Sequence, residues 1–170
     1  MSWYGSHEYL NEFIQENQCR RIMEVGVYNG ENAISMVKAA ITSLPAAEIV
    51  YYGFDFFHSY STEYIGRKLD ETGCKHFLYE GNTLDTVPEA AKTLPTMDMI
   101  FIDGGKSFME AWSDWEGSSK LIHSGTGVFV HNVGFSGVAK MVENIPRDIY
   151  DVELFFPRFE GKVALVRRIA

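Results

Sequence analysis

The chain has 170 residues, enough for one domain with a sizeable core, and its 46% hydrophobic and 14% aromatic content argues against disorder. Its net charge of −8 argues against a general nucleic-acid surface, which needs clustered Lys and Arg, and no apolar run approaches the length of a membrane span. Two cysteines without a C-x-x-C motif, and an N-terminus without a basic segment, predict a cytoplasmic protein with no signal peptide.

Strand and helix patterns alternate along the whole chain. In chain order we expect a helix over 8–17, a strand over 22–25, a helix over 31–44, a strand over 49–55, a helix over 63–72, a strand over 76–79, a helix over 83–93, a strand over 97–103, a helix over 107–122 closed by a turn around 125–127, a strand over 128–131, a helix over 137–144 and an antiparallel hairpin over 150–156 and 162–168. This order predicts one α/β domain over 1–170, with an N-terminal helix within 1–18, a terminal hairpin within 149–170, and helices on both faces of a mostly parallel sheet.

Polar or glycine residues directly follow one apolar run after another. They are Glu24, Asp55, 80–82, 103–105 and 131–132. Ligands of such sheets bind outside the carboxyl ends of the strands. Random loops would not need a carboxylate at one strand end after another, so this convergence favours a ligand site.

The turn after the first strand has the spacing Glu-x-Gly-x-x-x-Gly, with glycines at 26 and 30. Gly26 allows backbone angles that other residues avoid, and Gly30 lets the next helix begin close to the strand. A dinucleotide fingerprint has another glycine where Tyr28 stands, and Tyr28 would crowd a pyrophosphate. The turn therefore suits a ligand without phosphates, with Glu24 positioned to accept hydrogen bonds from it, although packing alone would also explain the glycines.

Two further positions have both a binding and a local interpretation. Asp55 could accept both hydroxyls of a ribose, with Phe56 covering a base, or it could be an ordinary loop carboxylate. Asn82 could meet an adenine edge, or it could cap the helix that begins near residue 83.

The run from Glu24 to Ala33 resembles the first motif of class I S-adenosylmethionine-dependent methyltransferases. The segments 101–108, 114–115 and 128–133, with the closing hairpin, resemble the small-molecule O-methyltransferase-like group called methyltransferase domain 24. This resemblance covers essentially the whole chain. It implies a Rossmann-like, seven-stranded sheet of order 3-2-1-4-5-7-6 with strand 7 antiparallel.

The same resemblance implies S-adenosylmethionine as the cofactor and a small-molecule acceptor, which we expect to be a hydroxyl. Glu24 and Gly26 would meet the methionine part of the cofactor, Asp55 the ribose, and Phe56 and Asn82 the adenine. The remaining cofactor candidates lie in the first turn and after the fourth strand: Tyr28, Asn29, Gly30 and Asp103.

The catalytic candidates are Asp103, Lys106 and His131. Lys106 or His131 could remove the hydroxyl proton, and an ordinary histidine has a suitable pKa. Either could instead be a solvated or hydrogen-bonded residue without a catalytic role. Metal-dependent relatives would place a divalent cation at Asp103, His131 and Asn132. One carboxylate and two neutral ligands suit magnesium poorly, so we do not expect a catalytic metal, although a softer metal could use His131.

A catalytically degenerate binding or partner domain is the main alternative, because the chain departs from the group's usual pattern at Lys106, His131 and Asn132. A nicotinamide-dependent oxidoreductase is disfavoured, because the chain has Tyr28 and Glu31 where the dinucleotide fingerprint has glycines. The sequence leaves the acceptor and the choice of O- or N-methylation open. Aromatic residues near Trp112 and Phe155 would suit a homodimer.

Overall fold

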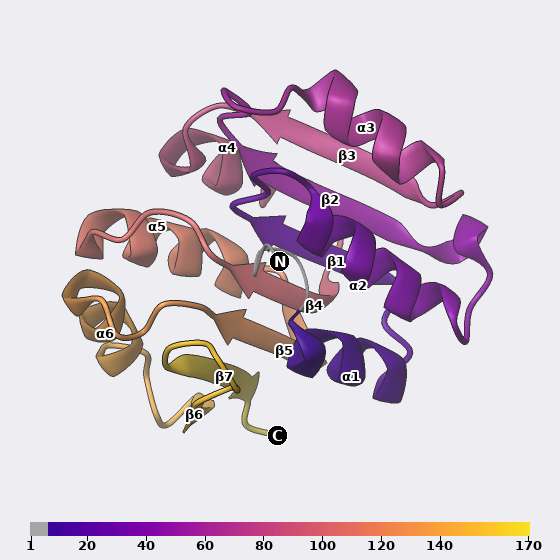
Figure 1. Cartoon of the computed structure of the whole chain (residues 1–170). Coiled ribbons are helices and arrows are strands. Elements are labelled where there is room, and N and C mark those ends of the chain that lie inside the picture. Colours follow the sequence, from indigo (N-terminus) through magenta and orange to yellow (C-terminus); the bar gives the residue numbers. More distant parts are fainter. Residues whose placement is uncertain (1–6) are drawn as a thin grey trace.

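In a computed structural model of the chain, which describes residues 7–170, seven strands form one sheet (Figure 1). Their order is β3-β2-β1-β4-β5-β7-β6, as expected. The bounds are β1 (Arg21–Val25), β2 (Val50–Asp55), β3 (Lys75–Glu80), β4 (Met97–Ile102), β5 (Ile122–Val130), β6 (Tyr150–Phe155) and β7 (Val163–Arg168). Strands β1 to β5 pair in parallel, and β7 runs antiparallel to both β5 and β6. The predicted α/β fold and its antiparallel seventh strand are confirmed.

Helices cover both faces of the sheet (Figure 1). One buried cluster joins the sheet to α1 (Glu8–Glu16), α2 (Glu31–Ile41) and α3 (Thr62–Asp70). A second cluster joins the other face to α4 (Thr83–Ala90), α5 (Phe108–Ser119) and α6 (Ser136–Glu143). A short 3₁₀ helix, η1 (Ala46–Glu48), lies before β2 and was not predicted. Of the region 1–18 in which we expected the N-terminal helix, residues 1–6 lie outside the described part.

Local sequence explains where these elements begin and which way they face. Successive residues of β1 enter opposite cores, because strand side chains alternate: Ile22 packs with the first cluster and Met23 with the second. Helix α5 begins at a capping box, in which Ser107 and Glu110 each accept a hydrogen bond from the other's backbone N–H. The sheet therefore lies between two apolar layers, and its strand ends are left for polar residues.

Strand β5 differs from the prediction. It begins at Ile122, and the expected turn around 125–127 lies inside it. The stretch from Met97 to Met99 of β4 faces the longer stretch from Ile122 to Gly127, so β5 takes up extra residues in an irregular register. Gly127 is needed for packing rather than for a turn, because a Cβ there would lie 2.5 Å from the Phe13 ring.

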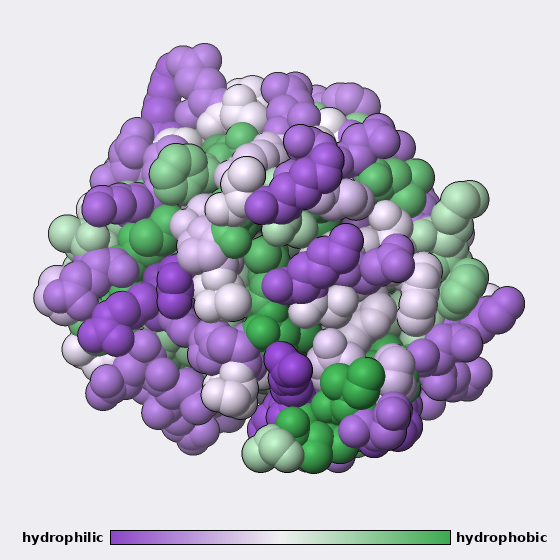
Figure 2. All heavy atoms as spheres, turned by 180° about the vertical axis from the view of Figure 1, so that it is seen from behind, coloured by the Kyte–Doolittle hydropathy of each residue, from purple (hydrophilic) through white to green (hydrophobic). Residues whose placement is uncertain are grey.

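Seen from behind, hydrophilic residues cover much of the visible surface, with smaller hydrophobic areas among them (Figure 2). Within residues 7–170, every helix falls short of the length and apolarity that crossing a bilayer requires. Both cysteines, Cys19 and Cys74, are buried free thiols.

Candidate functional site

A cleft of about 510 Å³ opens where β1, β4 and β5 end. It is lined by seven residues predicted for the site, which are Glu24, Gly26, Tyr28, Asn29, Asp103, His131 and Asn132. It is also lined by residues that the sequence did not single out, among them His7, Asn32, Phe159 and Glu160. Chain segments from near both ends of the described sequence therefore meet at the carboxyl ends of these strands.

Gly26 is essential to the shape of this cleft. Its φ is +93°, and a Cβ there would lie 2.2 Å from the Asp103 carbonyl oxygen. The turn after β1 therefore packs directly on the backbone that follows β4. Both properties need glycine; the sequence predicted the unusual backbone angles at Gly26 but not its contact with the Asp103 backbone.

The rest of this turn combines left-handed backbone with one polar and one apolar contact. Tyr28 has φ +51° and is about half exposed (52%). The carbonyl oxygen of Asn29 accepts a hydrogen bond from Lys68 Nζ at 3.1 Å. Gly30, with φ +76°, lies against Ile65, which a Cβ would approach to 2.8 Å. Gly30 thus shapes the start of α2 without lining the cleft.

Asp55 anchors the same turn from β2. Its Oδ2 accepts the backbone N–H groups of Val27 and Tyr28, each at 2.8 Å, and its Oδ1 accepts that of Phe57 at 3.2 Å. The local interpretation of Asp55 as a loop carboxylate is therefore realised here. Its contact with a ribose stays a prediction.

The two residues predicted to meet adenine lie beside the cleft rather than in its lining. Phe56 is 46% exposed, and its ring lies 5.1 Å from that of His58. Asn82 caps α4, since its side-chain oxygen accepts the N–H of Leu84 at 3.0 Å. Their contact with adenine also stays a prediction.

Glu24 is a buried carboxyl with internal partners. It accepts hydrogen bonds from the Tyr51 hydroxyl and, at 2.8 Å, from Asn32 Nδ2. Burial raises the pKa of Glu24 to about 8, although these two donors act against the rise. Glu24 therefore supports the floor of the cleft and keeps a proton more readily than an exposed glutamate.

Asp103 collects the catalytic candidates around one oxygen atom. Its Oδ1 accepts hydrogen bonds from Lys106 Nζ at 2.8 Å, Asn132 Nδ2 at 3.0 Å and His131 Nδ1 at 3.2 Å. Burial alone would raise the pKa of Asp103, but His131 and then Lys106 lower it below its ordinary value. Asp103 is thus held as an anion, and no hydrogen bond from residues 7–170 reaches its Oδ2.

This geometry does not suit the metal set considered from the sequence. Asp103, His131 and Asn132 do come together, but His131 Nδ1 and the Asn132 amide point N–H groups at the carboxylate. The Lys106 ammonium supplies positive charge at the same oxygen. These atoms bond to one another rather than enclosing a space for a cation.

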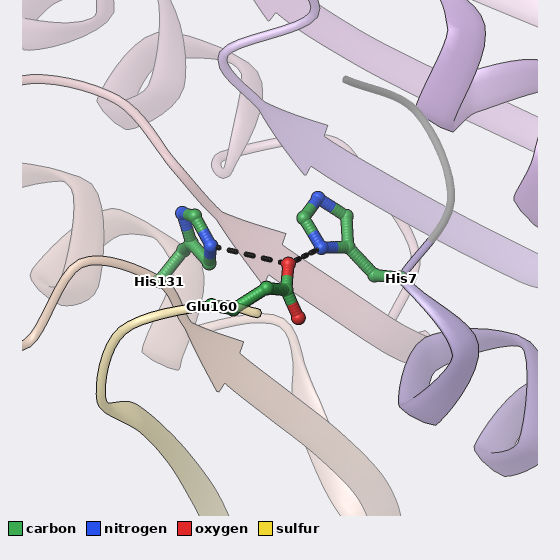
Figure 3. Close-up of side chains that lie close together, drawn as sticks. All are labelled: His7, His131 and Glu160. Carbon is green, nitrogen blue, oxygen red and sulfur yellow. Dashed lines mark hydrogen bonds and ion pairs between the residues drawn. The ribbon is translucent and has the colours of Figure 1, made fainter. Parts of the chain in front are cut away.

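A second cluster lies beside the first, formed by His7, His131 and Glu160 (Figure 3). Glu160 forms ion pairs with His7 Nδ1 and with His131 Nε2, the latter at 3.5 Å. Burial lowers the pKa of His131, but Asp103 and Glu160 more than reverse this and raise it to about 9. The near-neutral pKa expected for a His131 base was therefore wrong for the residue in these surroundings. Burial raises the pKa of Glu160, yet the two histidines bring it down to about 2.

A family model described as "Methyltransferase domain" (methyltransferase domain 24) matches residues 23–133, more than half of the chain. The chain belongs to this family. The match begins in β1 and ends just beyond β5, so it includes the Gly26 turn and the Asp103 cluster. A comparison with curated proteins gave no significant match.

Solved structures similar to this methyltransferase domain show the same fold. The O-methyltransferase TomG from Streptomyces achromogenes, solved with S-adenosylmethionine, has a TM-score of 0.77 at 21% identity, over 95% of this chain and 78% of its own. An O-methyltransferase from Bacillus cereus, solved with S-adenosylhomocysteine, has a TM-score of 0.75 at 15% identity, over 95% and 79%. CalS11, described as a TDP-rhamnose 3'-O-methyltransferase, has a TM-score of 0.78 at 16% identity, over 94% and 76%.

Sequence reasoning missed His7 and Glu160 as site residues of this methyltransferase domain. His7 had no identifiable partner, and Glu160 lies in the turn between β6 and β7, far away in sequence. No local pattern signals that this turn folds over the strand ends. Asp114 of α5 packs against Gly104, the residue after Asp103: it is fully buried, burial raises its pKa to about 6, and a Cβ on Gly104 would lie 2.5 Å from its Oδ2.

Proposed function

We propose that this protein transfers a methyl group from S-adenosylmethionine to a hydroxyl of a small molecule. One observation carries the proposal: the cleft joins the Gly26 turn to the Asp103 cluster inside a methyltransferase-domain fold. Two similar structures were solved with S-adenosylmethionine or S-adenosylhomocysteine, which supports the choice of cofactor.

In this proposal the methionine part of the cofactor lies in the cleft, against Gly26, Tyr28 and Asn29. The cleft is lined by the carboxylates of Asp103 and Glu160 and also by the basic side chains of His7 and His131, so a sulfonium there would share these carboxylates with the two imidazoles. The ribose would reach Asp55 through Oδ1, since Oδ1 accepts one N–H group whereas Oδ2 already accepts two.

The adenine would lie beyond the cleft, between Phe56 and Asn82. The half-exposed ring of Phe56 offers a face for stacking. With both contacts the cofactor would lie along the ends of β1, β2 and β3.

The protein's contribution to the reaction is mainly orientation. Asp103 is held anionic by its three donors, and its Oδ2 would accept the hydrogen bond of the acceptor hydroxyl. The acceptor oxygen then bonds to the methyl carbon as the carbon–sulfur bond breaks, and S-adenosylhomocysteine leaves. The hydroxyl proton passes to a base, for which the neutral forms of Lys106 and His131 are the candidates.

Calorimetric titration with S-adenosylhomocysteine tests the cofactor site. We expect saturable binding that weakens about tenfold or more in Asp55→Ala, because this change releases the turn after β1 as well as the ribose contact. Asp148→Ala is the matched control, because Asp148 is exposed and precedes β6, at the end of the sheet opposite the cleft. Absence of saturable heat in the unaltered protein would refute the proposal.

A binding domain without turnover is the second candidate. It is favoured by the Asp103 cluster, where Lys106, His131 and Asn132 all donate to one carboxylate oxygen. Mass spectrometry of reactions with S-adenosylmethionine and hydroxylated small molecules separates the two. Methylated product supports the enzyme, whereas cofactor binding without product from any acceptor supports the binding domain.

Two further expectations belong to this proposal. The buried free thiols of Cys19 and Cys74 favour a cytoplasmic setting, where thiols stay reduced. A homodimer stays a prediction, which the solution mass of the protein would test.

A further inference from the structure

We propose that His7, His131 and Glu160 form a binding site for a divalent transition-metal ion. The three side chains come from the segment before α1, the end of β5 and the β6–β7 turn, and their ligand atoms all lie within 4.8 Å of one another (Figure 3). All three residues line the cleft. An ion held there would therefore have open positions facing the cleft.

The spacing of the ligand atoms suits metal coordination. Two ligands of a tetrahedral zinc ion, with bonds of about 2.0–2.1 Å, lie roughly 3.4 Å apart. His131 Nε2 and Glu160 Oε1 are 3.5 Å apart. Nε2 is also buried without a hydrogen bond from residues 7–170. An inserted ion would satisfy this nitrogen, and the hydrogen-bonded His7 and Glu160 atoms would need only to separate.

The His131 imidazole is already oriented for such a role. His131 uses its other nitrogen, Nδ1, to contact Asp103 at 3.2 Å, so Nε2 is the atom directed at Glu160. A carboxylate on the far nitrogen is the usual outer partner of a metal-bound histidine. The His7 ring packs 5.1 Å from the rings of both Phe101 and His131.

The donor set selects the class of metal. Two imidazoles and one carboxylate suit zinc, cobalt, iron or nickel, whereas magnesium and calcium prefer oxygen ligands. Three protein ligands with an open position are typical of a catalytic rather than a structural site. The set differs from the one considered from the sequence, because the ligand atoms are His7 Nδ1, Glu160 Oε1 and His131 Nε2. Asp103 becomes the outer partner of His131, and Asn132 bonds to Asp103.

Metal binding itself does not depend on methyl transfer. Only a role of the ion toward the acceptor in the cleft rests on the proposed function, and with an ion on His131 Nε2 the candidate base of that reaction is Lys106 alone. The two ideas fail separately: a protein that binds zinc but not S-adenosylhomocysteine keeps the metal site and loses the methyltransferase proposal, and the reverse result does the opposite.

The test is calorimetric titration of the chelator-treated full chain with Zn²⁺, together with the visible absorption spectrum of its Co²⁺ complex. We expect one ion per chain. His7→Ala and Glu160→Gln should each weaken Zn²⁺ binding by more than about 100-fold, beyond the 10–100-fold typical of a changed outer partner, and should remove the cobalt spectrum. Asp103→Asn should fall within that smaller range.

Matched controls are His58→Ala and Glu153→Gln, since both residues are exposed and lie outside the cluster. Circular dichroism of each variant confirms that it folds. No stoichiometric zinc in the unaltered chain, or zinc that persists in His7→Ala and Glu160→Gln, would overturn the site. The cluster would then be only an ion-paired latch between the β6–β7 turn and the start of α1.

Discussion

Replacing Gly26 by alanine tests the close contact between the turn after β1 and the backbone after β4. The new Cβ would lie 2.2 Å from the Asp103 carbonyl oxygen, whereas ordinary contacts begin at 3.4 Å, so one backbone segment must move by about 1 Å. A non-glycine residue at positive φ costs about 1–2 kcal/mol, and overpacking adds about 1–3 kcal/mol. We expect a total loss near 3 kcal/mol, about 6–12 °C in Tm for a protein of this size.

Thermal and urea denaturation measure this loss, and titration with S-adenosylhomocysteine measures its effect on the cleft. The matched variant is Gly134→Ala, where φ is not positive and a Cβ would meet nothing within 4 Å. Because the Gly26 substitution displaces Asp103, it should also weaken cofactor binding about tenfold or more. A Gly26→Ala protein within 1 kcal/mol of Gly134→Ala would refute the reasoning from the backbone contact.

Three other substitutions test buried or clustered polar groups. Asp114→Asn should stabilise the protein by about 3 kcal/mol near pH 8 and have little effect near pH 4, measured by urea denaturation. The pKa of Asp114 in the folded protein is raised to about 6, so the stability that Asp114 contributes is fully present below its unfolded pKa and is lost as the pH rises through the folded value. Equal effects of the substitution at both pH values would contradict this. Tyr51→Phe should cost about 1–3 kcal/mol, more above pH 8 than below, because ionised Glu24 loses a donor; a pH-independent loss would argue against this pairing. Lys106→Met should slow methyl transfer about tenfold or more while cofactor affinity changes less than about threefold, because Asp103 loses a charged partner. Unchanged turnover would show that Lys106 has no role in the reaction.

The fold could be predicted well because its signals are local and periodic. Apolar runs locate the strands, and the order of strands and helices leaves few topologies. The Gly26 turn could be located for the same reason, since a positive φ and a close approach both demand glycine in the sequence itself. The error at β5 arose because Gly127 resembles a turn residue, while its real cause is the Phe13 ring from α1.

The side chains at the strand ends could be named, but their partners could not. Asp55 bonds to the turn after β1, and Asp103 bonds to three neighbours. These pairings depend on side-chain rotamers and on differences of a few tenths of an ångström between donor–acceptor distances, which a residue pattern does not contain. The raised pKa of His131 likewise could not be predicted, because it follows from Asp103 and from Glu160, a residue that only the folded hairpin brings near.

The position of β7 between β5 and β6 sets the order in which the molecule can be completed during synthesis. Strands β5 and β6 are synthesised before β7, which lies between them in the sheet. Neither can therefore complete its strand pairing until residues 163–168 leave the ribosome. Glu160 joins His7 and His131 at this same late step, across a separation of 153 residues from His7. Contacts between such distant residues form slowly. Until then the nascent chain would expose one edge of a five-stranded sheet, the stage at which we expect it to aggregate most readily.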